Sequence, residues 1–402
     1  MSKVYIVSAK RTAIGSFGGS FKSVPAAQLA AETVKAVLQE SRLAPNQVDE
    51  LLMGNVIAAG QGMGPGRQAA IAAGLPNEVP AYTVNMICGS GMKVVMDGAA
   101  HIKAGDADVV VACGGENMSR YPYIVTSDIR FGTKMGNLEM SDSLIDDGLT
   151  DVFNKYHMGI TAENVAQQLD VSRTDQDDFA LQSQLRAASA IESGKFVDEI
   201  VPVDVTVRRK TKTICQDEYP KAEAAAEAFT KMRPAFKKDG TVTAANASGL
   251  NDGGSAILLA SEAAVNQYAL EPIAELVSYA QSGVDPQVMG LGPVPAVAAA
   301  LTKAELSLKD IELLELNEAF AAQALGVMKQ LCTEHNESLT SLTERTNVNG
   351  GAIALGHPLG ASGNRIIVTL LHEMQKRGNK YGLASLCIGG GMGTAVVVKA
   401  IS

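Results

Sequence analysis

The sequence predicts an α/β protein built from alternating layers of sheet and helix. Short β-branched runs alternate with longer alanine-rich segments, a pattern typical of strands that are connected by helices. The length of 402 residues exceeds the usual size of one hydrophobic core, so we expect at least two domains. Because helices separate successive strands, we expect these strands to be mostly parallel.

Periodicity places the individual elements of these layers. Buried strands are expected over residues 4–7, 107–112, 311–316 and 394–398. Helices are expected over residues 26–40, 92–103, 163–169, 175–193 and 364–377. In the second and the last of these helices, apolar residues three and four positions apart form one face, as expected for helices that pack on a core.

A cryptic repeat relates the two ends of the chain. Val84-Asn85 precedes a glycine-rich turn, a helix and a strand ending in Gly114-Gly115, and Val348-Asn349 precedes the same order ending in three glycines. Duplicated α/β halves would explain this order; chance similarity of glycine-rich turns is the alternative. We expect one half over 1–119 plus 250–271 and the other over 272–402. The more polar stretch 120–249 is expected to be an inserted domain of loops.

Composition excludes several classes of protein. The formal charge of −9 argues against general binding of nucleic acid or of an anionic membrane. No apolar run approaches the roughly 20 residues of a membrane span, and the first residues do not have the pattern of a signal peptide. Five cysteines in such a long chain favour a reducing compartment, and we expect the cytoplasm.

Cys88 is the first candidate for chemistry. It lies in Asn85-Met86-Ile87-Cys88-Gly89-Ser90-Gly91, between a strand and a helix. The N–H groups at the start of that helix would lower the pKa of the thiol toward neutrality. A buried structural cysteine is the alternative, but the Gly-Ser-Gly turn favours a reactive thiol.

His357 and Cys387 are the other two candidates for chemistry. His357 lies in the turn Gly356-His357-Pro358, where proline disfavours helix, and a base for a thiol would be placed in such a turn. Cys387 ends an apolar run before Gly389-Gly390-Gly391. On local grounds this second thiol could be a general base, a resolving cysteine or a metal ligand, although no metal-ligand spacing accompanies it.

Asn317 follows the apolar run 311–316. A polar amide at the C-terminal end of a strand is typical of substrate sites in α/β sheets. An N-cap for the following helix explains the residue equally well. Other motifs are weak, because the glycine-rich segment 60–66 lacks the context of a dinucleotide site and the pattern of a serine nucleophile elbow is absent.

Together these segments resemble the thiolase family over essentially the whole chain. The resemblance rests on residues 85–92, 246–253, 317–321, 356–360 and 387–391. It implies the thiolase fold, with a duplicated five-layer α/β/α/β/α core and an inserted loop domain. It also implies an acetyl-CoA C-acetyltransferase without metal or other cofactor, which joins two acetyl-CoA molecules into acetoacetyl-CoA and CoA. A homotetramer, made of two dimers, follows from the same resemblance.

The resemblance also assigns roles to residues. Cys88 would carry the acetyl group, Cys387 would remove the α-proton of the second acetyl-CoA, and the N–H groups of Cys88 and Gly389 would hold an oxyanion. His357 would take the Cys88 proton and face the second thioester oxygen, with Asn317 acting through a water. Residues assigned to the substrate are His157, Met158, Ser248, Met289 and Phe320, while a structural role explains His157 equally well. Arg208, Arg209, Lys210 and Lys221 are candidates for the CoA phosphates.

Two alternatives and one departure accompany this reading. A β-ketoacyl synthase would use one cysteine and two histidines, whereas the last base here is Cys387. A redox sensor would link Cys88 to Cys387 in a regulatory disulfide, which is a hypothesis motivated by two activated thiols in one inferred site. The connector over 331–348 is longer and more polar than is usual in the family, and we expect a bulged surface loop there.

Overall fold

A computed structural model describes residues 3–221, 223, 224 and 226–401 and confirms the layered α/β fold. Its main sheet has the strand order β15-β16-β17-β14-β1-β13-β5-β3-β4. The first half of the chain forms one end of the sheet, with β1 (Val4–Thr12), β3 (Glu50–Gly54), β4 (Ala81–Val84), β5 (Val109–Asn117) and β13 (Asn251–Ser261). The second half forms the other end, with β14 (Ala274–Gly283), β15 (Leu313–Leu316), β16 (Tyr381–Ile388) and β17 (Met392–Ala400).

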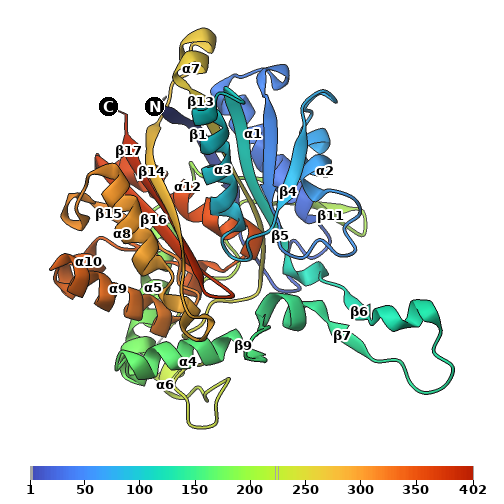
Figure 1. Cartoon of the computed structure of the whole chain (residues 1–402), viewed down its shortest axis with the longest axis vertical. Coiled ribbons are helices and arrows are strands. Elements are labelled where there is room, and N and C mark those ends of the chain that lie inside the picture. The colour runs from blue at the N-terminus through green and yellow to red at the C-terminus, as the bar shows by residue number, and fades with distance from the viewer. Residues whose placement is uncertain (1–2, 222, 225, 402) are drawn as a thin grey trace.

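The two halves join through a short ladder between β1 and β14. Only Tyr5 with Glu275 and Ile6 with Ala274 are paired there. In Figure 1 the first half, in blue and cyan, therefore lies beside the second half, in orange and red. The two halves of this continuous sheet, which meet at the ladder between β1 and β14, are called the first sheet and the second sheet below.

The expected predominance of parallel strands is wrong. β3 pairs in parallel with β4 and β5, and β15 pairs in parallel with β16. The longest ladders, β1 with β13, β5 with β13, β14 with β17 and β16 with β17, are antiparallel. In the second half a short turn after β16 reverses the chain direction into β17, and in the first half the antiparallel strand β13 follows the long insertion after β5.

Helices complete five layers. The helices α3 (Ser90–Ala104) and α12 (Leu359–Arg377) lie between the two sheets and share one core with both of them. The outer face of the first sheet is covered by α1 (Ala26–Ser41), α2 (Pro65–Ala72) and α7 (Glu262–Tyr268). The outer face of the second is covered by α8 (Pro293–Ala304), α9 (Ala321–His335) and α10 (Leu339–Glu344).

The two central helices cross at very short range. A Cβ atom added to Gly91 of α3 would lie 2.8 Å from the carbonyl oxygen of Gly360 and 2.9 Å from the backbone nitrogen of Asn364, both in α12. Only a glycine allows this approach of two backbones. Because each helix begins directly after a turn that carries chemistry, the crossing brings the Cys88 turn and the His357 turn together.

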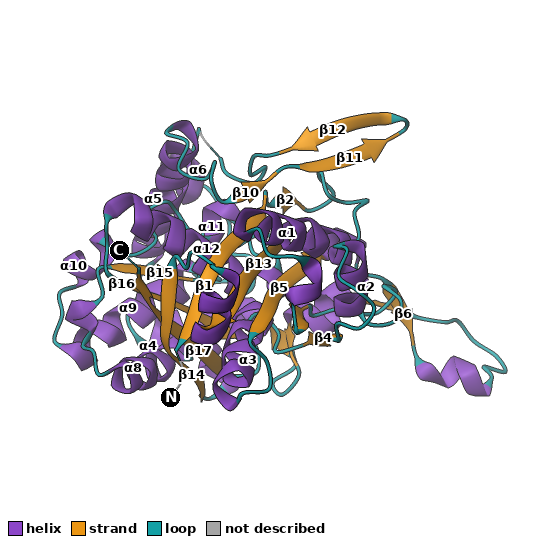
Figure 2. Ribbon diagram, turned by 90° about the horizontal axis from the view of Figure 1, so that it is seen from above, coloured by secondary structure: helices purple, strands orange, loops and turns teal. Residues whose placement is uncertain are grey.

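Segment 120–249 contains more regular structure than loops alone. It includes α4 (Met158–Gln168), α5 (Arg173–Glu192), α6 (Ala226–Thr230) and the short strands β6 (Tyr123–Val125), β7 (Met140–Asp142), β8 (Thr150–Asp151), β9 (Tyr156–His157), β10 (Ile200–Val201), β11 (Val203–Val207) and β12 (Lys210–Ile214). The arm that carries β6 and β7 projects from the body in Figure 1. The hairpin of β11 and β12 projects at another edge in Figure 2.

Several element boundaries differ from the expected ones. The predicted helices 163–169 and 364–377 each begin five residues earlier, at Met158 and Leu359. The connector 331–348 is not a bulged loop, because α9 continues through His335 and α10 follows, with the side chain of Leu342 fully buried. Among the described residues, no helix is both long and apolar enough to cross a membrane.

Candidate active site

One cavity of about 580 Å³ collects eight of the ten residues predicted for the site. Its lining includes Cys88, Met158, Ser248, Met289, Phe320, His357, Cys387 and Gly389. These residues come from both halves of the core and from the insertion, and the first and the last of them, Cys88 and Gly389, are 301 positions apart in the chain. The two halves of the core and the insertion therefore converge on one site.

The turn that carries Cys88 is held in an unusual backbone conformation. Ile87 has φ +48°, a left-handed conformation that is costly for a β-branched residue. The hydroxyl of Ser90 accepts the N–H of Met86 at 2.8 Å and donates to the carbonyl of Ile87 at 2.6 Å. The side chain of Asn85 also accepts the N–H of Ile87, at 2.9 Å. These bonds fix the chain on both sides of Ile87 and so set the position of Cys88.

The Cys387 turn lies against the Cys88 turn. β16 and β17 are joined by three glycines, of which Gly390 and Gly391 have φ +84° and +87°. A Cβ added to Gly89 would lie 2.3 Å from Cδ1 of Ile388, so the two turns are in close contact. The Cys387 side chain is buried, whereas the Cys88 side chain is half-buried.

His357 is buried and oriented by the residues around it. Its backbone N–H donates to Oδ1 of Asn251 at 2.9 Å. Its ring nitrogen Nδ1 lies 2.6 Å from the hydroxyl oxygen of Ser362. Its Nε2 has no hydrogen-bond partner among the residues that the structure describes. An unpaired buried nitrogen in the lining of a cavity is available to a substrate or to a thiol.

Burial controls the protonation of all three reactive groups. Burial raises the pKa of the Cys88 thiol to about 11, although the N–H groups of Gly389 and Cys88 act on the sulfur and lower it. The expected lowering of this pKa toward neutrality is therefore wrong, because desolvation outweighs the helix N-terminus. Burial also raises the pKa of Cys387, with the neighbouring Cys88 as a second cause. Burial and then Arg365 lower the pKa of His357 to about 3.

The free site consequently holds neutral thiols and a neutral imidazole at pH 7. A thiolate–imidazolium pair is not formed in advance, so Cys88 must lose its proton while it attacks. The orphaned Nε2 of His357 suits this task, since a base acts in its neutral form.

Asn317 is buried beside this site but is absent from the cavity lining. Its N–H donates at 3.0 Å to the carbonyl of Ser385, two residues before Cys387. Both side-chain atoms, Oδ1 and Nδ2, lack a partner within the described chain. The N-cap of α9 is Phe320, and among the described residues no N-cap side chain accepts a hydrogen bond from that helix end. The alternative of Asn317 as an N-cap is therefore excluded, and an unpaired amide remains behind the cavity.

His157 has a structural position. Its Nδ1 accepts the N–H of Gly159 at 3.0 Å and so caps α4. Its ring stacks on Phe236, with ring centroids 4.5 Å apart, and Phe236 in turn packs edge-on against Phe320. His157 is not part of the cavity lining but supports the lining residue Phe320 through Phe236, and its assignment to direct substrate contact stays a prediction.

The candidates for the CoA phosphates do not line the cavity either. Arg208 and Arg209 form the tip of the hairpin of β11 and β12, with φ +49° and +67°.

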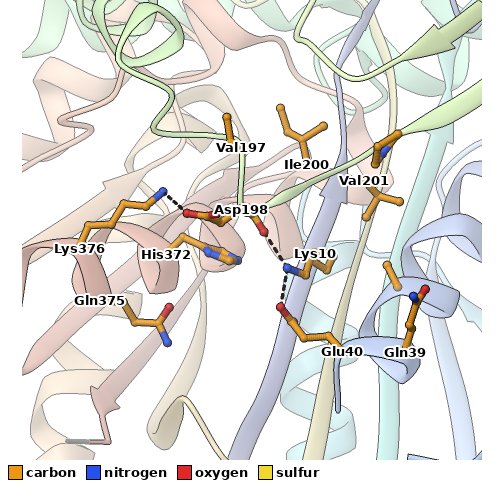
Figure 3. Close-up of a pocket in the computed structure, with 12 residues that line it drawn as sticks. Lys10, Gln39, Glu40, Val197, Asp198, Ile200, Val201, His372, Gln375 and Lys376 are labelled. Carbon is orange, nitrogen blue, oxygen red and sulfur yellow. Dashed lines mark hydrogen bonds and ion pairs between the residues drawn. The ribbon is translucent and has the colours of Figure 1, made fainter. Parts of the chain in front are cut away.

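A second hollow, of about 750 Å³, lies between α1, α12 and the segment before β10 (Figure 3). Its charged groups pair with one another, as Lys10 does with Glu40 and Lys376 with Asp198. None of the ten predicted site residues lines it.

Sequence reasoning missed several residues that build the site. Ser90 and Ser362 position the nucleophile and the imidazole, and the segment 146–153 forms one wall of the cavity. Both serines stand in short Gly-Ser-Gly or Ala-Ser-Gly segments beside a reactive turn, which was the available signal. The wall residues carry no comparable signal, because only the path of the insertion brings them to the cavity.

The fold and this pair of thiols define a class of protein. The family model for the thiolase N-terminal domain matches residues 4–263, and that for the thiolase C-terminal domain matches residues 270–400. The chain therefore belongs to the thiolase family.

Among its relatives are proteins named acetyl-CoA acetyltransferase. The one from Chromobacterium violaceum is 53% identical, and the match covers 99% of each chain. The one from Escherichia coli is 51% identical, and the match covers 100% of each chain. Among solved structures, human mitochondrial 3-ketoacyl-CoA thiolase is 44% identical with a TM-score of 0.94, covering 100% of this chain and 99% of that one. The Bacillus anthracis acetyl-CoA acetyltransferase is 43% identical with a TM-score of 0.95 and the same coverage.

Proposed function

We propose that this protein is an acyltransferase, an acetyl-CoA C-acetyltransferase that reversibly converts two acetyl-CoA molecules into acetoacetyl-CoA and CoA. The observation that carries the proposal is the convergence of Cys88, Cys387 and the unpaired Nε2 of His357 on one cavity. Full-length relatives that carry this name support the same activity.

The reaction divides between the two thiols. Cys88 attacks the thioester carbonyl of the first acetyl-CoA, its proton passes to Nε2 of His357, and CoA leaves with a proton. Cys387 then gives its own proton to Nε2 of His357 and, as a thiolate, removes an α-proton of the second acetyl-CoA. The carbanion attacks the acetyl group on Cys88, and the Cys88 thiolate that leaves takes the proton back from Nε2. A thiolate is both a good nucleophile and a fair leaving group, which this two-step route requires. The more exposed Cys88 is the better placed of the two for acyl transfer.

Two backbone donors support the acyl transfer. The N–H groups of Gly389 and Cys88 already act on the Cys88 sulfur in the free site, and the same groups would hold the oxyanion of the acetyl-enzyme carbonyl. Loss of one such donor typically costs about 100- to 1000-fold in rate. The enolate of the second substrate would face His357 and a water held by the unpaired amide of Asn317.

The acyl end of the substrate is proposed to be small. Met158, Met289 and Phe320 line the cavity beside Cys387, and their bulk would limit the chain length. Met289 is buried, so Met289→Ala would open space for several methylene groups. We expect the variant to gain activity on six-carbon relative to two-carbon acyl-CoA, measured as a ratio of kcat/KM values. An unchanged ratio would remove Met289 from the acyl pocket.

The remaining features of the proposal concern cofactors and partners. Proton removal by a thiolate and acyl transfer through a thioester require neither metal nor redox cofactor, so none is proposed. The partners are acetyl-CoA, acetoacetyl-CoA and CoA, and not nucleic acid or membrane. A homotetramer of two dimers would cover the arm of β6 and β7, where Phe131 and Met135 are 87% and 94% exposed. The cytoplasm fits the five free thiols.

Peptide mapping by mass spectrometry after mixing with acetyl-CoA tests the mechanism. We expect acetylation of the peptide that holds Cys88 and its loss in Cys88→Ser. Cys387→Ser is the matched control, because it should still acetylate Cys88 but fail to condense. Acetylation elsewhere would contradict the role of Cys88, and normal condensation by Cys387→Ser would contradict the role of Cys387.

A further inference from the structure

The imidazole of His357 is backed by a serine rather than by a carboxylate. Its Nδ1 lies 2.6 Å from the hydroxyl oxygen of Ser362, and the Ser362 side chain is fully buried in the first turns of α12. The same oxygen lies 2.9 Å from the carbonyl oxygen of Pro358, to which it donates. The hydroxyl therefore has two neighbours. Nδ1 of His357 can donate or accept, depending on the tautomer of the ring, whereas the carbonyl of Pro358 can only accept.

The proton of this hydroxyl has one favourable direction. A carbonyl carries no proton, so the two oxygens 2.9 Å apart would repel each other unless the hydroxyl proton lies between them. A hydroxyl has only one proton, so Ser362 cannot also donate to Nδ1 of His357. Nδ1 must then carry a proton and donate it to Ser362, which leaves Nε2 with its lone pair.

We propose that Ser362 is a positioning residue that holds His357 in the Nδ1–H tautomer, so that all proton transfer at this histidine passes through Nε2. This inference rests on the proposed function, because the transfer to Nε2 belongs to that reaction. Ser362 does not line the cavity, and its hydroxyl bonds to His357 and to the carbonyl of Pro358, so it acts through the imidazole.

The proton balance of the first half-reaction follows from this tautomer. The S–H bond of Cys88 breaks and its proton binds Nε2 while sulfur bonds to the thioester carbon. When the carbon–sulfur bond to CoA breaks, the proton moves from Nε2 to the CoA sulfur. Nδ1 keeps its proton throughout, so His357 returns to its starting form without exchanging a proton with solvent.

A neutral hydroxyl also differs from a carboxylate in its effect on the imidazolium. A carboxylate behind Nδ1 would stabilise the charged ring, whereas a hydroxyl adds no charge to a site where burial already disfavours the imidazolium. The protonated ring is therefore a strong acid, which favours rapid return of the proton to the leaving sulfur.

Ser362→Ala is the informative substitution. It removes the acceptor of the Nδ1 proton, and a buried N–H without a partner is unfavourable. The ring should then shift its proton to Nε2, where it blocks acceptance of the Cys88 proton. We expect acetylation of Cys88 to slow by about 100-fold, the lower end of what general base catalysis typically contributes. The carbonyl of Pro358 keeps two backbone donors, Ala361 and Ser362, each at 2.9 Å, so the helix start is retained.

Ser255→Ala is the matched control. Ser255 is likewise fully buried, and its hydroxyl donates at 2.9 Å to the carbonyl of Ala361, one residue before Ser362. Ser255→Ala removes a hydroxyl of β13 that donates to the same helix start, and within the described chain Ser255 makes no hydrogen bond to His357. Ser362→Thr keeps a hydroxyl and should restore the tautomer and much of the rate.

The experiment measures two quantities on the full-length protein. Infrared difference spectra, with the spectrum of His357→Gln subtracted, report the ring-stretch band that distinguishes the two neutral tautomers. Rapid quenching with intact-mass analysis reports the rate of acetylation by acetyl-CoA. We expect the Nδ1–H tautomer in the wild type and in Ser255→Ala, and the Nε2–H tautomer with slow acetylation in Ser362→Ala.

Two results would overturn the inference: an unchanged tautomer in Ser362→Ala, or acetylation by this variant at the wild-type rate. Failure of the proposed function looks different, because the wild type itself would then not acetylate Cys88. The infrared readout needs no activity and would still decide the role of Ser362. If Ser362→Thr does not fold, the pair Ser362→Ala and Ser255→Ala remains sufficient.

Discussion

Ser90→Ala should damage catalysis far more than stability. The Ser90 hydroxyl accepts the N–H of Met86 and donates to the carbonyl of Ile87. Without it, the N–H of Met86 loses its partner, at a cost of about 1–3 kcal/mol. The carbonyl of Ile87 keeps a bond from the N–H of Ser90 at 3.0 Å, so only one group is orphaned.

Relaxation of the backbone offsets part of this loss in the free energy of unfolding. Ile87 is held at φ +48°, and its return to an ordinary conformation would recover about 1–2 kcal/mol. The net loss in the free energy of unfolding is therefore about 1 kcal/mol. The same relaxation displaces Cys88, the next residue, and a shift of about 1 Å in a reacting atom can cost about 100-fold in rate.

Two measurements separate these effects: the urea midpoint and the rate of Cys88 acetylation. Ser278→Ala is the control, because its buried hydroxyl donates at 2.7 Å to Ala300 in the second half of the core. It should lose a similar amount of stability and keep its rate. Acetylation by Ser90→Ala at the wild-type rate, or a rate loss matched by Ser278→Ala, would refute the reasoning.

Three further predictions follow, two from the thiols of this site and one from the buried Glu116, whose carboxylate accepts the backbone N–H groups of Val56 and Gly360, each at 2.9 Å. Because burial raises the pKa of Cys88 to about 11, its alkylation by iodoacetamide should rise about tenfold per pH unit from pH 7 to 9; a plateau near pH 7 would contradict this. Burial raises the pKa of Glu116 from 4.5 to about 7, so its stabilising contribution is complete below pH 4.5 and is lost as pH rises through 7. Glu116→Gln should flatten this part of the curve of urea midpoint against pH, and an unaltered curve would exclude Glu116 as its source. Mild hydrogen peroxide should join Cys88 to Cys387 in a disulfide, with two waters released per peroxide. The free-thiol count should fall from five to three, and activity should be lost until a thiol reductant is added. An unchanged count and activity would exclude the regulatory disulfide.

Local chemistry explains what could be read from the sequence. Glycines around Cys88, His357 and Cys387 indicate turns because only a few neighbouring residues determine such conformations. The five-layer order followed from the resemblance and is confirmed by the core shared between α3, α12 and both sheets. The start of α12 was missed because Leu359-Gly360-Ala361-Ser362-Gly363 has weak helix propensity, and burial between two sheets stabilises it instead.

The sequence by itself determined which residues could carry the chemistry, the turns that hold them and the family to which the chain belongs. Only the tertiary structure decided that the strands are mixed in direction, that His157 caps a helix and that Asn317 does not. It also reversed the expected direction of the shift in the Cys88 pKa, because desolvation depends on every segment packed around a group and not on its neighbours in the chain. Contacts between residues as distant as Gly89 and Ile388 have no local signal, so their convergence became visible only in the folded chain.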